Sequence, residues 1–472
     1  MGIVLIENWN AWESLAVTEG YLTDYATYAE ENFYGSGAPL TTANGGLTDW
    51  LATSIGVGND ENVLFTPCMY QEYTLYHAST TPSPQTPYIN TCGTYAIDLP
   101  TAQPLGSDAS DDNYYYYCFW IRLDTYTVPD DDMKFGFFSL NDGTNCCFML
   151  CANRQGHLYA YPTNNTLANV HKNPATDIGD NWVMFGDEAT LGEAYADTEN
   201  LSIGPLNIDG EGGTSGNGDW KLVEVKFRLQ DAAATVDGHF EVRVDGRSVM
   251  TYTGDTNRSD TVSSITTMWF SHLAFIADQD AAVIAGHNGV DSVGYVQRAF
   301  YDDILVLDES GSKLNGFPDK YTLYSMKPNQ ASPAGSPTGD EGWEASIGGT
   351  NAIDSLEEFD LPRWTTEEPE AGTYTAPLVA PLDSALTGLV ESVVWVDSVS
   401  VSLGEAYDRV ERRVGTTAAT TSDLNQDTHP LATTTADIRK FCVMEQNPIT
   451  AADWTLSNLT SNLYMRWNFQ NT

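Results

Sequence analysis

The segment of residues 220–256 constrains the fold more than any other part of this sequence. Apolar and charged side chains alternate over residues 223–229 and again over residues 240–245, which is the period of two that a half-buried β-strand requires. The dipeptide Asp245-Gly246 follows, and glycine tolerates the positive φ of a two-residue hairpin turn. The segment therefore predicts an antiparallel β-meander. With 472 residues, the chain is expected to form more than one domain.

The chain is strongly acidic. Its 65 Asp and Glu residues outnumber its 21 Lys and Arg residues, for a formal net charge of −44. Such a surface repels nucleic acids and anionic membranes, so neither is expected as a direct partner. Solubility, or adaptation to salty water in which charge repulsion is screened, explains this acidity. The alternative is that some of the carboxylates bind Ca²⁺.

The candidate calcium ligands are the consecutive residues Asp130, Asp131 and Asp132, because carboxylate oxygens are the hard ligands that Ca²⁺ prefers. Consecutive aspartates in a turn are more often simply solvated. The seven cysteines show neither a disulfide framework nor a CxxC pair. Cys147 and Cys151 are spaced to share one strand face, which is typical of small buried apolar residues and not of a zinc site. No cofactor is therefore expected.

The sequence contains no recognisable catalytic motif. GxSxG, HExxH and the GxxxxGK[ST] phosphate loop are all absent. Glycoside hydrolysis needs two carboxyl groups about 5–5.5 Å or about 6.5–9.5 Å apart. Glu241 and Asp245 share a strand face but would lie ~13 Å apart, while Asp302 and Asp303 are adjacent and would point to opposite faces of a strand. We therefore predict no catalytic residues and no enzyme, with a glycoside hydrolase or lyase as the alternative.

Two further strands stand out. The most aromatic one is predicted at residues 114–124, YYYYCFWIRLD, whose rings suit the core of a sandwich; the alternative is a sugar-binding sheet face. Residues 299–308 predict a strand that is buried on both faces, because apolar side chains there are continuous instead of alternating.

Neither a membrane span nor a secretory signal is expected. No apolar run approaches the ~20 residues that cross a bilayer. The opening MGIVLIENWNAWES lacks a basic stretch and predicts a first strand instead. The chain is thus expected to be made in a cytoplasm, and either to stay there or to leave it inside an assembly.

Several segments together resemble the laminin-G-like, concanavalin A-like jelly-roll proteins that are common among virion proteins of tailed bacteriophages. They are GIVLIENWN, YYYYCFWIRLD, the pair VEVKFRL and GHFEVRVDGRSVMTYTGDT, and FYDDILVLDESGSKLNGFPDKYTLY. Near the end, EQNPITAADWTLSNL is similar to the closing segment of a small C-terminal module in such proteins. The resemblance implies an all-β fold: a large antiparallel jelly-roll sandwich followed by a small C-terminal β-sandwich.

The expected domain limits follow from this resemblance and from composition. The jelly roll is expected over residues 1–328, with loop insertions near residues 30–60 and 163–219. Residues 329–377 are rich in Pro, Gly and Ser, which predicts an irregular linker. The small C-terminal sandwich is expected over residues 378–472.

The resemblance also implies a role. It indicates a non-catalytic bacteriophage virion structural protein, exposed on the particle as a tail fibre, a spike or a capsid decoration. Its expected partners are other virion proteins, further copies of itself in a homo-oligomer and, during host attachment, host surface glycans. The expected location is the virion, after synthesis in the cytoplasm of the host bacterium. A glycan-degrading or glycan-binding enzyme module on the same fold is the alternative, and the resemblance carries over no ligand-binding residue.

Overall fold

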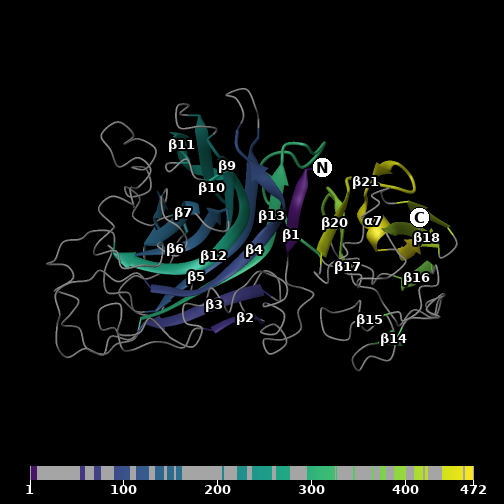
Figure 1. The fold of residues 1–472 in the computed structure, drawn as a ribbon, viewed down its shortest axis with the longest axis horizontal. Coiled ribbons are helices and arrows are strands. Elements are labelled where there is room, and N and C mark those ends of the chain that lie inside the picture. The colour runs from purple at the N-terminus through teal and green to yellow at the C-terminus, as the bar shows by residue number, and fades with distance from the viewer. Residues whose placement is uncertain are drawn as a thin grey trace. The chain divides into compact units, whose positions relative to one another are not determined.

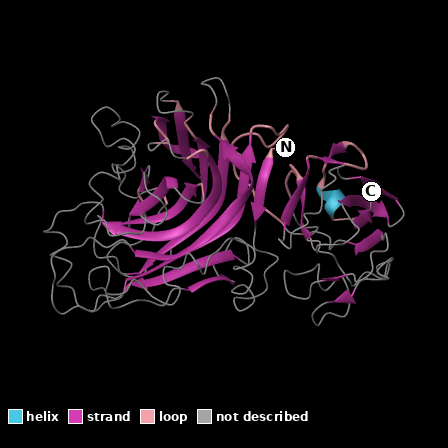
Figure 2. Cartoon of the chain, viewed as in Figure 1, coloured by secondary structure: helices cyan, strands magenta, loops and turns pink. Residues whose placement is uncertain are grey.

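The part of the chain that the structure describes consists mainly of β-strands. The computed structural model describes residues 2–7, 54–58, 68–75, 90–106, 113–126, 133–142, 146–153, 156–161, 205–206, 220–230, 237–257, 262–276, 295–324, 326, 344–345, 364–365, 373–378, 387–399, 409–417, 420–423, 438–460 and 463–470. Within these ranges the one helix is α7 (Leu456–Leu459), and strands outnumber the loops and turns, as Figure 2 shows.

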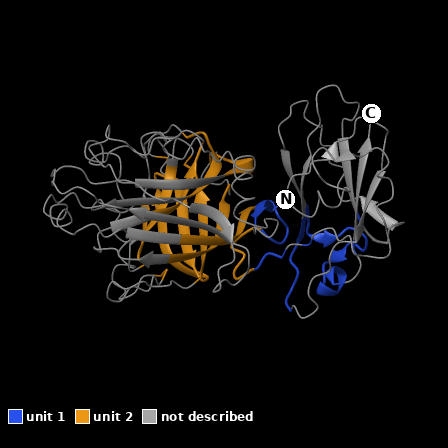
Figure 3. Ribbon diagram, turned by 90° about the horizontal axis from the view of Figure 1, so that it is seen from below, with its two compact units in different colours: residues 1–13, 310–314, 322–472 blue, residues 14–309, 315–321 orange. Residues whose placement is uncertain are grey.

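The chain divides into two compact units, drawn in different colours in Figure 3. Unit 1 comprises residues 1–13, 310–314 and 322–472, and unit 2 comprises residues 14–309 and 315–321. The domain limits expected from the sequence are a separate prediction, which this division into units does not test.

Unit 2 contains a large antiparallel sheet, here called sheet A, in which the strands follow the order β11-β10-β9-β5-β13-β3-β2. Figure 1 shows several strands of this unit as long, curved ribbons. The bounds of the strands in this order are β2 (Ser54–Gly58), β3 (Cys68–Leu75), β5 (Tyr115–Tyr126), β9 (Lys221–Arg228), β10 (Gly238–Val244), β11 (Arg247–Gly254) and β13 (Tyr295–Asp308).

A second antiparallel sheet, sheet B, has five strands in the order β4-β12-β6-β7-β8. Their bounds are β4 (Asn90–Pro104), β6 (Met133–Asn141), β7 (Cys146–Asn153), β8 (Leu158–Tyr161) and β12 (Ser264–Ile276).

Aromatic rings from the two sheets meet in one core. Phe119 of sheet A has its ring centroid 5.0 Å from that of Phe138 and 5.3 Å from that of Phe270, both on sheet B. Further along, Phe148 of sheet B lies 5.1 Å from both Phe227 and Phe240 of sheet A. Each of these rings is buried, and removing one from water stabilises the fold by roughly 1.5–3 kcal/mol. The predicted all-β, antiparallel sandwich is confirmed.

The predicted hairpin of the central meander is also confirmed. Asp245 and Gly246 have φ values of 52° and 76°, so both central residues adopt the positive φ of a type I′ turn. The Asp245 carboxylate accepts a hydrogen bond from the Leu222 backbone N–H (3.1 Å) and lies 3.0 Å from the Lys221 ammonium. The turn is therefore tied back to the neighbouring strand β9.

The structure confirms some of the other sequence-based predictions for unit 2 and differs from one of them. Residues 304–307 are all buried, as predicted for a strand covered on both faces, and Cys147 and Cys151 are buried, as predicted for small apolar residues on one strand face. Residues 54–58, at the end of the expected insertion 30–60, instead form β2. Glycine disfavours strands, but β2 pairs along its whole length with β3, and these backbone hydrogen bonds outweigh that weak preference.

Unit 1 is built from short strands. They are β1 (Ile3–Glu7), β14 (Glu344–Ala345), β15 (Trp364–Thr365), β16 (Thr373–Leu378), β17 (Val393–Val399), β18 (Arg409–Thr417), β19 (Thr420–Asp423), β20 (Ile438–Met444), β21 (Gln446–Asn447), β22 (Ala452–Asp453) and β23 (Tyr464–Gln470). The order β16-β23-β18-β19 forms one sheet, and β17 pairs with β20. The opening residues were predicted to form a first strand, and β1 confirms this.

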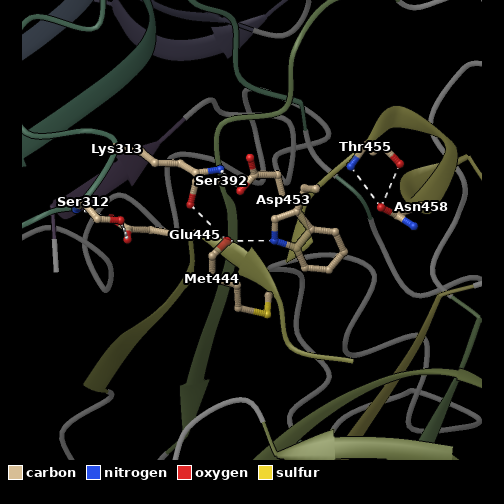
Figure 4. A network of polar contacts seen from close by, with 9 residues as sticks. Ser312, Lys313, Ser392, Met444, Glu445, Asp453, Thr455 and Asn458 are labelled. Carbon is tan, nitrogen blue, oxygen red and sulfur yellow. Dashed lines mark hydrogen bonds and ion pairs between the residues drawn. The ribbon is translucent and has the colours of Figure 1, made fainter. Parts of the chain in front are cut away.

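The segment EQNPITAADWTLSNL folds as a compact turn and helix. The buried Trp454 donates a hydrogen bond through Nε1 to the Met444 carbonyl (2.8 Å). Asn458 accepts hydrogen bonds at Oδ1 from the backbone N–H (3.0 Å) and hydroxyl (2.8 Å) of Thr455, at the start of α7, as Figure 4 shows. Glu445 accepts hydrogen bonds from Ser312. These contacts give the segment a structural role.

Candidate functional site

Sheet A presents one face to sheet B and one face away from it. Phe227 and Phe240 point toward sheet B, where both meet Phe148. Because successive side chains of a strand point to opposite faces, the residues between them point the other way. We call that second face the outer face of sheet A.

The strand register aligns polar residues in rows across the outer face. In one row Lys226 of β9 is the partner of Glu241 on β10 and of Tyr116 on β5. In the next row Arg228 of β9 is the partner of His239 on β10. Charged and aromatic side chains from three strands are thereby brought together.

At one edge of these rows the side chains converge on a single ring. The Lys226 ammonium lies 3.8 Å from the centroid of the Tyr114 ring, and the Arg228 guanidinium carbon lies 5.8 Å from it. The His239 ring packs edge-on against the same ring at 5.7 Å. We call Tyr114, Lys226, Arg228 and His239 the Tyr114 cluster. Tyr114, Lys226 and His239 are half-buried, whereas Arg228 is buried.

The charges of the Tyr114 cluster are only partly compensated. The Arg228 guanidinium forms an ion pair with Asp237 at 3.1 Å. Lys226 forms no ion pair with any residue that the structure describes, and its ammonium rests against the Tyr114 ring. Burial, helped by the charge of Lys226, lowers the pKa of His239 below its ordinary value of 6.5. The imidazole is therefore neutral at pH 7.

Hydroxyl groups border the cluster on the neighbouring strand β11. His239 Nδ1 lies 3.0 Å from the Thr253 hydroxyl, and Thr251 is the cross-strand partner of Glu241. Both threonines are exposed. The surface thus offers an ammonium, an imidazole, a carboxylate and hydroxyls beside one aromatic ring.

Residues 315–321 cover another part of the outer face. The Phe317 ring packs edge-on against Tyr116 at 5.1 Å, and the Arg243 guanidinium carbon lies 3.7 Å from the Phe317 ring centroid. The Tyr321 carbonyl accepts a hydrogen bond from Trp120 Nε1 at 3.2 Å. Tyr116 and Trp120 are buried, so this part of the face is closed.

A carboxylate is enclosed in this closed part. Glu224 is 0 % exposed, and neither of its carboxylate oxygens accepts a hydrogen bond of good geometry from the described residues. Burial raises the pKa of Glu224 to about 7; Asp319 and Glu241 add to this effect, and the Arg243 guanidinium opposes it. The Arg243 guanidinium also donates a hydrogen bond from Nε to Glu241 at 2.8 Å. Glu224 is thus a costly buried acid with only partial compensation.

The structure separates the two interpretations of the aromatic strand. Tyr115, Tyr117 and Phe119 are buried, and Tyr117 and Phe119 pack against the rings of sheet B, which confirms the core interpretation for that face. Tyr116 and Trp120 lie on the outer face beneath residues 315–321, and Tyr114 lies in the Tyr114 cluster. The alternation of strand residues could have indicated two different environments, but nothing in the sequence indicated which rings a later segment covers.

The remaining candidate residues from the sequence do not form a site. Asp130, Asp131 and Asp132 lie outside the described residues. Asp302 and Asp303 are both buried at an irregularity of β13, where Asp303 has a φ of 46° and its backbone N–H donates a hydrogen bond to Asp302 at 2.8 Å. This irregularity interrupts the strict alternation that the sequence argument assumed.

The described residues lack two further features. They contain no group of three or more His, Cys, Asp or Glu side chains arranged to hold a metal ion. They also contain no helix with the length and apolar character needed to cross a membrane.

Comparisons with known proteins gave matches to solved structures alone. No family model matches the chain, and no curated protein matches it. A solved endo-β-1,4-glucuronan lyase from the fungus Trichoderma reesei is 13% identical, with 57% of this chain and 92% of that chain covered and a TM-score of 0.29. An alginate lyase is also 13% identical, with coverages of 64% and 96% and a TM-score of 0.29.

A toxin domain is among the other matches. The binding domain of botulinum neurotoxin DC, solved with rat synaptotagmin II, is 8% identical, with coverages of 90% and 95% and a TM-score of 0.25. At such TM-scores, the likeness carries no argument about what this chain does.

Proposed function

We propose that the protein binds glycans, without chemical conversion, through the Tyr114 cluster on the outer face of sheet A. The observation that carries this proposal is the half-buried Tyr114 ring with Lys226 and His239 packed around it and exposed threonine hydroxyls alongside. A sugar ring has apolar C–H faces and a rim of hydroxyl groups. A site that places an aromatic ring beside a few fixed polar groups matches both parts.

The scaffold supports binding because the cluster stands on paired strands. Lys226, Arg228 and His239 project from β9 and β10, which are hydrogen-bonded to each other over six residue pairs. The opposite faces of β9 and β10 pack into the aromatic core, as the contacts of Phe227 and Phe240 with Phe148 show. A ligand would therefore meet groups whose backbone positions are held before binding, which reduces the entropy cost of binding.

A glycan array with the full chain tests this proposal, with Tyr114→Ala as the in-site variant. We expect binding to a subset of polysaccharides and a loss of about tenfold in affinity for Tyr114→Ala, because an aromatic anchor of this kind contributes ~1–2 kcal/mol. Tyr252→Ala is an unsuitable control because Tyr252 stacks on the core ring Phe240. Thr266→Ala, on sheet B and away from the outer face, is the matched control. Equal array profiles for Tyr114→Ala and wild type would refute the proposal.

The absence of conversion is tested with the same polysaccharides. We expect no new reducing ends and no unsaturated sugar after prolonged incubation, because glycoside hydrolysis and β-elimination both require a positioned acid or base at the scissile bond. Release of either product, abolished by a substitution in the Tyr114 cluster, would replace the binding proposal with the lyase or hydrolase alternative.

The setting of this activity is a separate proposal. The resemblance of segments such as GIVLIENWN and YYYYCFWIRLD to bacteriophage jelly-roll proteins supports a place on the surface of a virion. Many copies on one particle would convert weak glycan contacts into strong attachment, since each later contact meets a high effective concentration. Quantitative mass spectrometry of purified particles would give the copy number, and absence of the chain from the particles would contradict this setting.

A further inference from the structure

We infer that the glycan bound at the Tyr114 cluster is acidic, and that Lys226 recognises the carboxylate of a uronic acid residue in it. This inference rests on the proposed glycan-binding function and adds the class of ligand. It is carried by the position of the Lys226 ammonium, which sits 3.8 Å from the Tyr114 ring centroid without an ion pair to any described residue.

The distribution of charge favours an anionic ligand at this place. The chain as a whole has only 21 basic residues against 65 acidic ones. Five of the 21 lie within residues 221–247, at positions 221, 226, 228, 243 and 247. The same segment holds five acidic residues, at positions 224, 231, 237, 241 and 245, so its formal charge is neutral while the chain as a whole is strongly negative. An anion is therefore repelled less at this segment than elsewhere on the chain.

Of these five cations, Lys226 and Arg247 form no ion pair with a described residue, and Lys226 is the one that lies in the Tyr114 cluster. The Arg228 guanidinium is paired with Asp237 at 3.1 Å, and the Arg243 guanidinium is bonded to Glu241 at 2.8 Å. The Lys221 ammonium lies 3.0 Å from the Asp245 carboxylate at the hairpin turn. Each of these cations already has an acidic partner, so an incoming anion gains most from Lys226.

The neighbours of Lys226 suit a carboxylate in particular. A lysine ammonium is a point charge with three donors, and a carboxylate bonded to it needs few further partners. The His239 ring is neutral at pH 7, and its ring nitrogens can take part in hydrogen bonds with sugar hydroxyls. A sulfate ester has three terminal oxygens and is held best by several donors, for which the engaged guanidinium groups of Arg228 and Arg243 are poorly placed.

The main comparison, by isothermal titration calorimetry, is between two polymers and four proteins, and Tyr114→Ala and dextran sulfate are added to distinguish the alternatives. The polymers are alginate, a polyuronate, and the same alginate after chemical reduction of its carboxyl groups, which removes the charge and keeps the sugar backbone. The proteins are the full-length wild type, Lys226→Gln, Lys226→Arg and Lys221→Gln. Lys221→Gln is the control, since it removes the same charge from the same strand outside the cluster.

We expect wild type to bind native alginate about tenfold more tightly than reduced alginate, which corresponds to one charge-assisted hydrogen bond. Lys226→Gln should lose this preference and bind both polymers alike, whereas Lys226→Arg and Lys221→Gln should keep it. A double comparison of this kind isolates the contact between Lys226 and the carboxylate from general effects of each change.

Other results would overturn the inference in distinguishable ways. Equal binding of native and reduced alginate by wild type, with both weakened by Tyr114→Ala, would refute the acidic ligand and leave glycan binding intact. A preference for native alginate that Lys226→Gln retains would refute the role of Lys226. Binding to dextran sulfate that is tighter than to alginate and depends on Lys226 would replace the carboxylate with a sulfate. Binding to none of these polymers, together with an empty glycan array, would overturn both the inference and the proposed function.

Discussion

The two faces of sheet A are made from the same strands but differ in almost every physical respect. On β9, Val223, Val225 and Phe227 are fully buried against sheet B, and the residues between them carry charge. The inner face is uniform, because every position must fill space in a shared core. The outer face is divided into a part closed by residues 315–321 and a part that exposes the Tyr114 cluster.

This difference separates the parts of the sheet that stabilise the fold from the part that can contact a ligand. Closing the outer face over Tyr116 and Trp120 also encloses Glu224, a carboxylate whose burial is unfavourable. Leaving the other part open keeps Lys226 and His239 within reach of a ligand. The faces can therefore be tested separately by substitutions on single strands.

The largest expected effect is on the inner face. Phe119→Ala should lower the free energy of unfolding of unit 2 by about 3–5 kcal/mol, because the ring contacts Phe138, Phe270 and Tyr301 and its removal leaves a cavity. Urea unfolding followed by tryptophan fluorescence would measure this loss. Tyr114→Ala on the outer face, with a cost of about 1 kcal/mol or less, is the comparison. Similar costs for the two variants would contradict the distinction between the faces.

The next effect concerns the closed part of the outer face and depends on pH. Because the pKa of Glu224 rises from its ordinary 4.5 to about 7 on folding, the folded state holds the proton more tightly than the unfolded state. Proton binding by Glu224 stabilises the folded state in full below pH 4.5. This stabilisation is lost as the pH rises through 7, and the free energy of unfolding then falls by roughly 3 kcal/mol. Glu224→Gln removes the titration.

Urea unfolding of wild type and Glu224→Gln over a range of pH measures this contribution. We expect the variant to be more stable than wild type at about pH 8 and close to it at about pH 4.5, since glutamine cannot ionise. Glu241→Gln is the control, as Glu241 belongs to the same face but is partly exposed and paired with Arg243. A stability difference that stays constant with pH would show that Glu224 does not titrate in this range.

The smallest effect concerns the turn that sets which residues reach each face. Gly246 has a φ of 76°, and a Cβ atom added there would meet no atom within 4 Å. Gly246→Val should therefore destabilise the fold through backbone strain alone, by roughly 1–2 kcal/mol. Gly246→Asn, which tolerates positive φ far better, should cost less than half of this. Equal melting temperatures for the valine and asparagine variants would show that positive φ is not the constraint at this turn.

Local sequence patterns predicted much of unit 2. The alternation over residues 223–229 and 240–245 predicted β9 and β10, and Asp245-Gly246 predicted the type I′ turn between β10 and β11. These features depend on neighbouring residues alone, because strand period and turn dihedral angles are local properties of the backbone. The same patterns could not anticipate β2, whose glycine-rich sequence becomes a strand through its pairing with β3.

The sequence by itself determined that alternate residues of β5 and β9 face opposite sides, and that the chain is acidic overall. It did not determine that β5 lies beside β9, which brings Tyr114 next to Lys226 although they are far apart along the chain. Nor did it determine that residues 315–321 return to cover Tyr116 and leave Tyr114 accessible. Only the tertiary structure decided these points, because the pairing of distant strands depends on the packing of the whole core and not on the period of any one segment.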